Sequence, residues 1–205
     1  MALTFTIREK RPEDGPVLAC LLVEAFLNKY KALAGSRRDK ALAIVKEEMD
    51  FRGVEGNFFV AETDGKIIGA IEILDTDISG VPREKEISIY LNHLGLARGL
   101  KSIYLLSLLA RALGSDEACV SQLAVSSEAR RLGVARALLA HGENYARRRQ
   151  KKHLLLWVAE SNTPAVSLYE SAGFEVVRKT GSGLHKRFFG EEVWLEFDKN
   201  LTERI

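Results

Sequence analysis

The chain has 205 residues, of which 46% are hydrophobic, so it is long enough to bury one sizeable core. We therefore expect a single domain over residues 1–205. Thirty Lys and Arg residues stand against 28 Asp and Glu residues, and the formal net charge is only +2. This balance argues against nucleic acid or an anionic membrane surface as a partner.

The N-terminal segment and the cysteines are typical of a cytoplasmic protein. MALTFTIREK lacks the layout of a signal peptide, and no uncharged apolar run approaches the roughly 20 residues of a membrane helix. Cys20 and Cys119 have apolar neighbours and no Cys-x-x-Cys spacing, which predicts buried thiols rather than a disulfide or a metal site. The four histidines are scattered, so no metal site is predicted.

The first half of the chain predicts a strand, two helices and then a pair of strands. Residues 3–9 alternate apolar and polar side chains, as a strand does. Pro12 favours a helix start, because its fixed φ and missing N–H suit a first turn. A second helical pattern covers residues 37–51. Residues 57–74 form two β-rich runs around Asp64-Gly65, a dipeptide typical of a tight hairpin turn.

Residues 78–117 are rich in leucine at helical spacing, and Gly95, Gly99 and Gly114 interrupt the pattern. We expect one or two helices in this segment. Three roles stay open for it: a cap of the sheet, a lining of an acceptor pocket, or a dimer contact.

The second half predicts a strand, a helix, a strand, a short helix and two strands. They begin with residues 118–126 and a helix from Val134, and continue with residues 153–161, 164–172, 174–180 and 191–197. Residues 153–161 are almost continuously apolar, as in a strand covered on both faces. Thr163 is the expected N-cap of the short helix, with Pro164 at its first position.

The turn before the helix at Val134, EARRLGVARALL, is a candidate anion site. The first N–H groups of a helix have no intrahelical acceptor, and the helix dipole adds about half a positive charge there. A phosphate can reach them only past an unobstructed backbone, which Gly133 and the small Ala135 provide. Arg130 and Arg131 add donors suited to phosphate oxygens. The Walker and G-x-G-x-x-G patterns are missing, which argues against a nucleotide hydrolase or a Rossmann site.

Two motifs resemble those of the GNAT acetyltransferase superfamily. LAVSSEARRLGVARALL resembles its acetyl-CoA motif, in which Arg130, Gly133 and Ala135 fill the pattern Arg or Gln, x, x, Gly, x, Gly or Ala. ESNTPAVSLYESAGF resembles the motif that follows it, through Asn162, Ala165, Leu168, Tyr169, Gly173 and Phe174. Residues 7–26 and 58–73 are similar to the first three strands and the first helix of the family. Only residues 78–117 fall outside the resemblance.

The resemblance implies an α/β (α+β) GNAT fold. Its sheet is central, mixed, mostly antiparallel and twisted, with about seven strands, flanking helices and a helical insertion between the third and fourth strands. In such proteins acetyl-CoA, a co-substrate, lies where the fourth and fifth strands splay apart. The implied cofactor-binding residues are Leu123, Ala124, Val125, Arg130, Arg131, Leu132, Gly133, Val134, Ala135, Arg136 and Asn162.

The implied chemistry is direct transfer of an acetyl group to a primary amine of a small molecule or protein. Backbone N–H groups of the fourth strand would stabilise the oxyanion. Tyr169 matches the position that gives a proton to the leaving thiolate. Two alternatives stay open: a non-catalytic acyl-CoA-binding or regulatory module, and a transferase that uses a longer acyl-CoA. The acceptor is not predicted, and either a monomer or a homodimer fits.

No general base is assigned. Cys119 and Ser121 stand where some relatives carry a glutamate on the fourth strand. Glu72, Asp75 and Asp77, on or after the third strand, are candidate replacements unless they are simply solvated, and a water chain would serve as well.

Two further features have ordinary structural explanations. The basic run at residues 147–152 is expected to stabilise a helix C-terminus rather than to bind a polyanion or the 3'-phosphate of CoA. Trp157 and Trp194 are expected to be core aromatics rather than platforms for a substrate.

Overall fold

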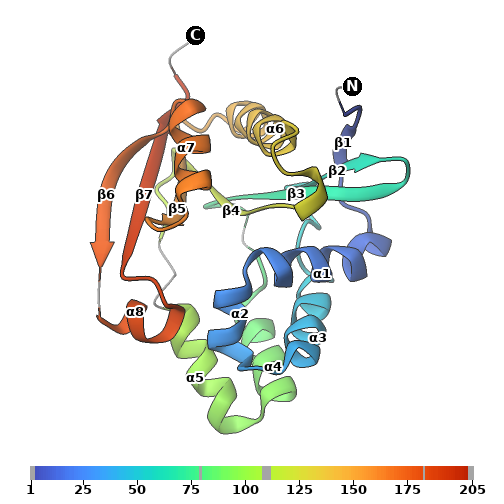
Figure 1. The fold of residues 1–205 in the computed structure, drawn as a ribbon, viewed down its shortest axis with the longest axis vertical. Helices are drawn as coiled ribbons and strands as arrows, with labels where there is room; N and C mark the ends of the chain where they lie inside the picture. Colours follow the sequence, from blue (N-terminus) through green and yellow to red (C-terminus); the bar gives the residue numbers. More distant parts are fainter. Residues whose placement is uncertain (1–2, 79, 108–111, 182, 203–205) are drawn as a thin grey trace.

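The computed structural model in Figure 1 describes residues 3–78, 80–107, 112–181 and 183–202. The strands are β1 Thr6–Glu9, β2 Phe58–Thr63, β3 Lys66–Asp75, β4 Glu117–Val125, β5 His153–Ala159, β6 Glu175–Gly181 and β7 Val193–Asn200. The helices are α1 Gly15–Ala25, α2 Leu27–Ala34, α3 Arg38–Glu48, α4 Arg83–Leu94, α5 Leu96–Ser107, α6 Val134–Arg148, α7 Thr163–Ser171 and α8 Gly183–Phe189. Short 3-10 turns at Pro12–Asp14 and Ser127–Ala129 precede α1 and α6.

The strands form one seven-stranded sheet in the order β1-β2-β3-β4-β5-β7-β6. Neighbouring strands are antiparallel except β4 and β5, which are parallel. The predicted mixed, mostly antiparallel sheet flanked by helices is therefore confirmed. The β2–β3 hairpin turns at Asp64 and Gly65, both with positive φ, as the dipeptide predicted.

Helices cover both faces of the sheet, and alternate residues of the strands supply the two hydrophobic layers. Phe58, Val60 and Ala124 pack with buried residues of α1 to α5. Phe59 and Ile71 face the other way and pack with α6 and α7. Figure 1 shows α6 and α7 on one side of the sheet and α1 to α5 on the opposite side.

The predicted insertion contains two helices, α4 and α5, and lies between β3 and β4 as expected. Ile89, Tyr90, Leu94 and Leu105 are buried in the same cluster as the core residues of α1 to α3. The insertion thus enlarges the helical layer on that face. Residues 79 and 108–111 of the predicted segment lie outside the described residues.

Two local predictions were wrong. Asn162, not Thr163, is the N-cap of α7, because its Oδ1 accepts a hydrogen bond from the N–H of Ala165 at 3.4 Å. Cys20 is exposed whereas Cys119 is buried. The apolar neighbours of Cys20 in sequence do not surround it in space, since helix α1 turns its buried face elsewhere. In the described part of the chain, no helix is both long and apolar enough to cross a membrane.

Candidate functional site

Strands β4 and β5 separate after a short parallel pairing. The paired residues run from Glu117 opposite His153 to Cys119 opposite Leu155 and go no further. Beyond that point β4 continues beside β3, and β5 continues beside β7. Within the described residues, the edge of β4 at Leu123 to Val125 therefore has no strand partner on the β5 side. The backbone groups of Leu123 and Val125 point to this edge, because those of Ala124 face β3.

The N-terminus of α6 lies directly after this edge and carries no side-chain cap. Gly133 is its N-cap, with φ +85°, and the first hydrogen bond along the helix runs from the N–H of Ala137 to the carbonyl of Gly133 at 3.0 Å. The N–H groups of Val134, Ala135 and Arg136 precede that bond, so they have no acceptor within the helix. These three N–H groups lie at the turn where the sequence predicted an anion site, and they lack both an intrahelical acceptor and a side-chain cap.

Gly133 serves this site in two ways. Its left-handed φ is one that residues with a side chain rarely adopt, so the turn favours glycine. A Cβ at this position would meet no atom within 4 Å, so the space in front of the helix is open. The sequence predicted the open approach, and the structure adds the backbone reason.

The three arginines around the turn differ in their surroundings. The side chains of Arg130 and Arg131 are exposed, and Arg131 also has a positive φ of 63°. The guanidinium of Arg136 instead donates to Oγ of Ser171 at 2.7 Å and so links α6 to α7. The guanidinium of Arg136 is therefore engaged with α7, and the side chain of Leu132 is exposed.

Tyr169 lies on α7 with its ring between two other aromatic rings. Their centroids lie 6.1 Å away for Phe174 and 5.8 Å away for Phe197, and Tyr169 is only 8% exposed. Burial raises the pKa of Tyr169 to about 12. Its hydroxyl therefore stays protonated at neutral pH, which a proton donor requires.

The three carboxylates considered as bases have different environments. Glu72 is fully buried, and its Oε2 lies 2.7 Å from Nη1 of Arg52. The side chain of Asp75 is 2% exposed and pairs with Arg149, whereas that of Asp77 is 72% exposed. Only Asp77 is solvated. Among the described residues, no group of three or more His, Cys, Asp or Glu is arranged to hold a metal ion.

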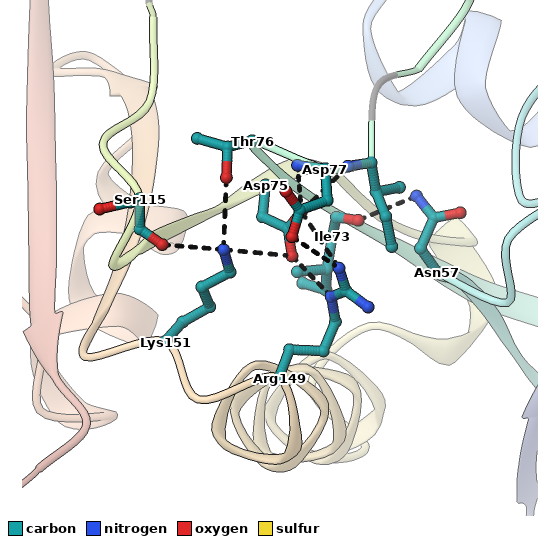
Figure 2. Close-up of polar contacts among 9 residues, drawn as sticks. Asn57, Ile73, Asp75, Thr76, Asp77, Ser115, Arg149 and Lys151 are labelled. Atoms are coloured by element: carbon teal, nitrogen blue, oxygen red, sulfur yellow. Dashed lines mark hydrogen bonds and ion pairs between the residues drawn. The ribbon is translucent and has the colours of Figure 1, made fainter.

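We call the space where β4 and β5 separate the wedge. A polar network links the two strands at the end where they still pair (Figure 2). Oδ2 of Asp75 accepts a hydrogen bond from Nε of Arg149 at 2.6 Å. Nζ of Lys151 donates to the carbonyl of Ser115 at 2.9 Å and lies 3.7 Å from the same Asp75 oxygen. Ser115 stands just before β4 and Lys151 just before β5. The network therefore holds both strands at the end where they pair, and it uses two cations of the 147–152 run, partly exposed Arg149 and buried Lys151.

Replacing Asp75 by Asn is expected to lower the free energy of unfolding by about 2 kcal/mol, the usual worth of hydrogen bonds to a charged group. Burial raises the pKa of Asp75, but the hydrogen bonds from Arg149 and from the N–H groups of Asp77 and Ile78 outweigh it and hold the pKa below its ordinary value. The carboxylate therefore stabilises the fold above the pKa of the unfolded state, about 4, and this contribution is lost as the pH falls through the lower folded-state pKa.

Urea unfolding of parent and variant across the acid range measures both effects. The parent should lose stability more steeply than the variant below about pH 4. Equal stability of the two proteins near neutral pH would show that the network does not stabilise the fold.

The two tryptophans lie on β5 and β7, and both are half-buried. Nε1 of Trp194 is enclosed and has no hydrogen-bond partner in the described part of the chain. The prediction of core aromatics therefore holds only in part.

Comparison with known proteins agrees with this geometry. A profile of the Acetyltransferase (GNAT) family matches residues 23–174. The structure of an N-acetyltransferase from Staphylococcus aureus is similar with a TM-score of 0.67 and 19% identity, over 95% of this chain and 100% of that chain. The ribosomal-protein-S18-alanine N-acetyltransferase from Escherichia coli is similar with a TM-score of 0.56 and 17% identity, over 98% of this chain and 97% of that chain. At such identities the likeness shows the fold.

A sequence relative matches a shorter stretch. Mycothiol acetyltransferase from Acidothermus cellulolyticus is 46% identical over 52 residues. The match covers 25% of this chain and 16% of that protein, so the chain spans only a small part of this relative.

Proposed function

We propose a function for this chain, which belongs to the acetyltransferase (GNAT) family: it transfers the acetyl group of acetyl-CoA to a primary amine of a small molecule or a protein. The observation that carries the proposal is the uncapped N-terminus of α6, which directly follows the unpaired edge of β4. A helix N-terminus that can bind an anion, next to backbone N–H and C=O groups without a strand partner, suits a ligand that has both a pyrophosphate and amide groups.

The residues around the wedge fit acetyl-CoA, which supplies an activated thioester when bound. Backbone N–H groups from Arg131 to Arg136 would hold the pyrophosphate, with the exposed side chains of Arg130 and Arg131 nearby. Leu123 and Val125 would pair with the pantetheine amides, while Ala124 between them directs its backbone groups to β3. The open space in front of Gly133 supports this assignment. Asn162 completes the proposed set, and its side-chain oxygen also caps α7.

In the proposed reaction, the chain positions the reactants and stabilises charge. Backbone N–H groups on the free edge of β4 would stabilise the negative charge that develops on the thioester oxygen. The hydroxyl of Tyr169, protonated because its pKa is raised to about 12, would give a proton to the leaving sulfur. We assign no side chain as the base, and water can carry the proton from the amine.

The names of two relatives illustrate the two acceptor classes in the proposal. One names an alanine of ribosomal protein S18, and the other names mycothiol. A non-catalytic acyl-CoA-binding module is the second candidate, because Glu72 and Asp75 are both engaged in ion pairs and so are poor candidates for a free base. A transferase for a longer acyl-CoA would use the same wedge.

A transfer assay tests the function. The chain is incubated with acetyl-CoA and a panel of small primary amines and of peptides with a free N-terminal amine, and free CoA and acetylated products are measured. We expect an acetylated product that depends on both reactants. Binding of acetyl-CoA without transfer to any probe would favour the non-catalytic module instead, and a preference for longer acyl groups would appear when acyl-CoA chain length is varied.

A further inference from the structure

A chain of buried polar contacts runs from the insertion to the central sheet. The hydroxyl of Tyr90 on α4 donates to Oε1 of Glu48 at 3.1 Å. Arg52 then bridges two carboxylates, since its Nη2 lies 3.5 Å from Oε2 of Glu48 and its Nη1 lies 2.7 Å from Oε2 of Glu72 on β3. All four residues are less than 9% exposed. Burying three charged groups is costly unless they are paired, so this arrangement fixes the orientation of Glu72.

Glu72 retains one oxygen that no protein group satisfies. Its Oε1 is enclosed and has no hydrogen-bond partner among the described residues, and the same holds for Oε1 of Gln122. Glu72 and Gln122 are directly opposite each other in the antiparallel pair of β3 and β4. Opposed residues point to the same face with Cβ atoms about 5 Å apart, so the two side chains are neighbours. Two enclosed hydrogen-bond acceptors side by side leave each other unsatisfied.

A half-turn of the Gln122 amide about its Cγ–Cδ bond resolves this conflict. Of the two polar atoms of that amide, only Oε1 is enclosed without a partner. The terminal torsion of glutamine is broad and roughly two-fold, so the oxygen and the nitrogen exchange places readily. After the turn, Nε2 would be the group placed to donate to Oε1 of Glu72, and the amide oxygen would take the less enclosed position.

Gln122 lies beside the segment of β4 that is proposed to bind acetyl-CoA. Gln122 is only 4% exposed and immediately precedes Leu123 to Val125, the segment of β4 proposed to bind the pantetheine part of acetyl-CoA, which ends in the thioester. Its side chain shares a face with Ala124, which packs toward α1 to α5 and away from α6. Gln122 therefore lies on the face of β4 opposite to α6, next to the proposed position of the thioester.

We propose that Gln122 binds the acceptor: its amide oxygen accepts a hydrogen bond from the attacking amine, and Glu72 orients the amide by accepting the Nε2–H. Arg52, Glu48 and Tyr90 are positioning residues that hold Glu72. The insertion, through Tyr90, thereby supports the acceptor site without touching the amine. This inference rests on the proposed function and adds the residue that receives the amine.

Gln122→Met tests the proposal, because Met has a similar length but cannot hydrogen-bond as an amide does. We expect kcat/KM for the amine to fall about 10-fold to 100-fold, while the Kd for acetyl-CoA stays within about twofold. Gln150→Met is the matched control: the same change at the only other glutamine, exposed in the turn after α6, should leave kcat/KM unchanged. Gln122→Asn, which keeps an amide but withdraws it by one methylene, should also lose acceptor kcat/KM.

The possible outcomes distinguish a failure of the role of Gln122 from a failure of the proposed acetyltransferase function. Folded Gln122→Met and Gln122→Asn variants with the acceptor kcat/KM of the parent would overturn the role of Gln122 and leave the proposed function intact. Loss of acetyl-CoA binding in either folded variant would also overturn it, since Gln122 would then serve the cofactor edge. If the parent acetylates no small amine or peptide of the panel, the proposed function fails, and the inference fails with it.

Discussion

A Gly133→Glu variant is expected to remain folded and to bind acetyl-CoA at least about 100-fold more weakly than the parent, a change of nearly 3 kcal/mol. The new side chain would enter the open space in front of α6, where a Cβ meets no atom within 4 Å. Its carboxylate would occupy the place proposed for the pyrophosphate and repel it. A negative charge at a helix N-terminus is itself stabilising, which partly offsets the strain of a positive φ.

Calorimetric titration with acetyl-CoA measures the effect, and Gly133→Ala is the control. Alanine carries the same backbone strain at φ +85° without the charge or the length of glutamate. Alanine should therefore weaken binding much less than glutamate does. Parent-like affinity in Gly133→Glu would place the cofactor elsewhere on the molecule.

A Tyr169→Phe variant is expected to lower kcat by about 100-fold or more, within the usual range for a positioned general acid. Phenylalanine keeps the ring contacts with Phe174 and Phe197, so the variant should keep its fold and its Kd for acetyl-CoA. Loss of kcat without a change in cofactor binding is the mark of an interaction made only in the transition state.

The pH profile gives a second test of Tyr169. Burial raises its pKa to about 12, so the hydroxyl remains a donor throughout the neutral and mildly alkaline range. The activity of the parent should therefore show no loss from this group until the pH approaches that value. A kcat for Tyr169→Phe equal to that of the parent would exclude the tyrosine as proton donor.

Much of the fold was predictable because its signals are local. The Asp64-Gly65 turn, the alternating strands and the two motifs each depend on residues close together in sequence. Helices α2 and α8 were missed, since both are short and have weak or mixed apolar patterns, and such helices form through tertiary contacts. Phe188 of α8, for example, packs against the cluster built by α1 to α5.

In the candidate site, too, the features with local sequence signals were predictable and those that depend on tertiary contacts were not. Motif spacing singled out Gly133 and Tyr169, but it could not show the positive φ of one or the burial of the other. The pairing of Glu72 with Arg52 joins residues 20 positions apart, and that of Asp75 with Arg149 joins residues 74 apart. No local pattern distinguishes such buried carboxylates from the solvated carboxylates that their sequence context favours. The sequence also does not show that Glu72 and Gln122 are opposite each other, each with an enclosed oxygen that lacks a hydrogen-bond partner among the described residues, because this depends on the strand register and on burial.

Backbone hydrogen exchange with and without acetyl-CoA tests the central claim most directly, because it reports on the N–H groups themselves. Our account predicts that acetyl-CoA slows exchange at Leu123 and Val125, whose N–H groups point to the free edge of β4, and at residues 131–136 around the N-terminus of α6. The β2–β3 hairpin around Asp64, away from the wedge, should be unaffected. Slowed exchange confined to other segments, or none under saturating acetyl-CoA, would contradict the assignment of the wedge as the cofactor site.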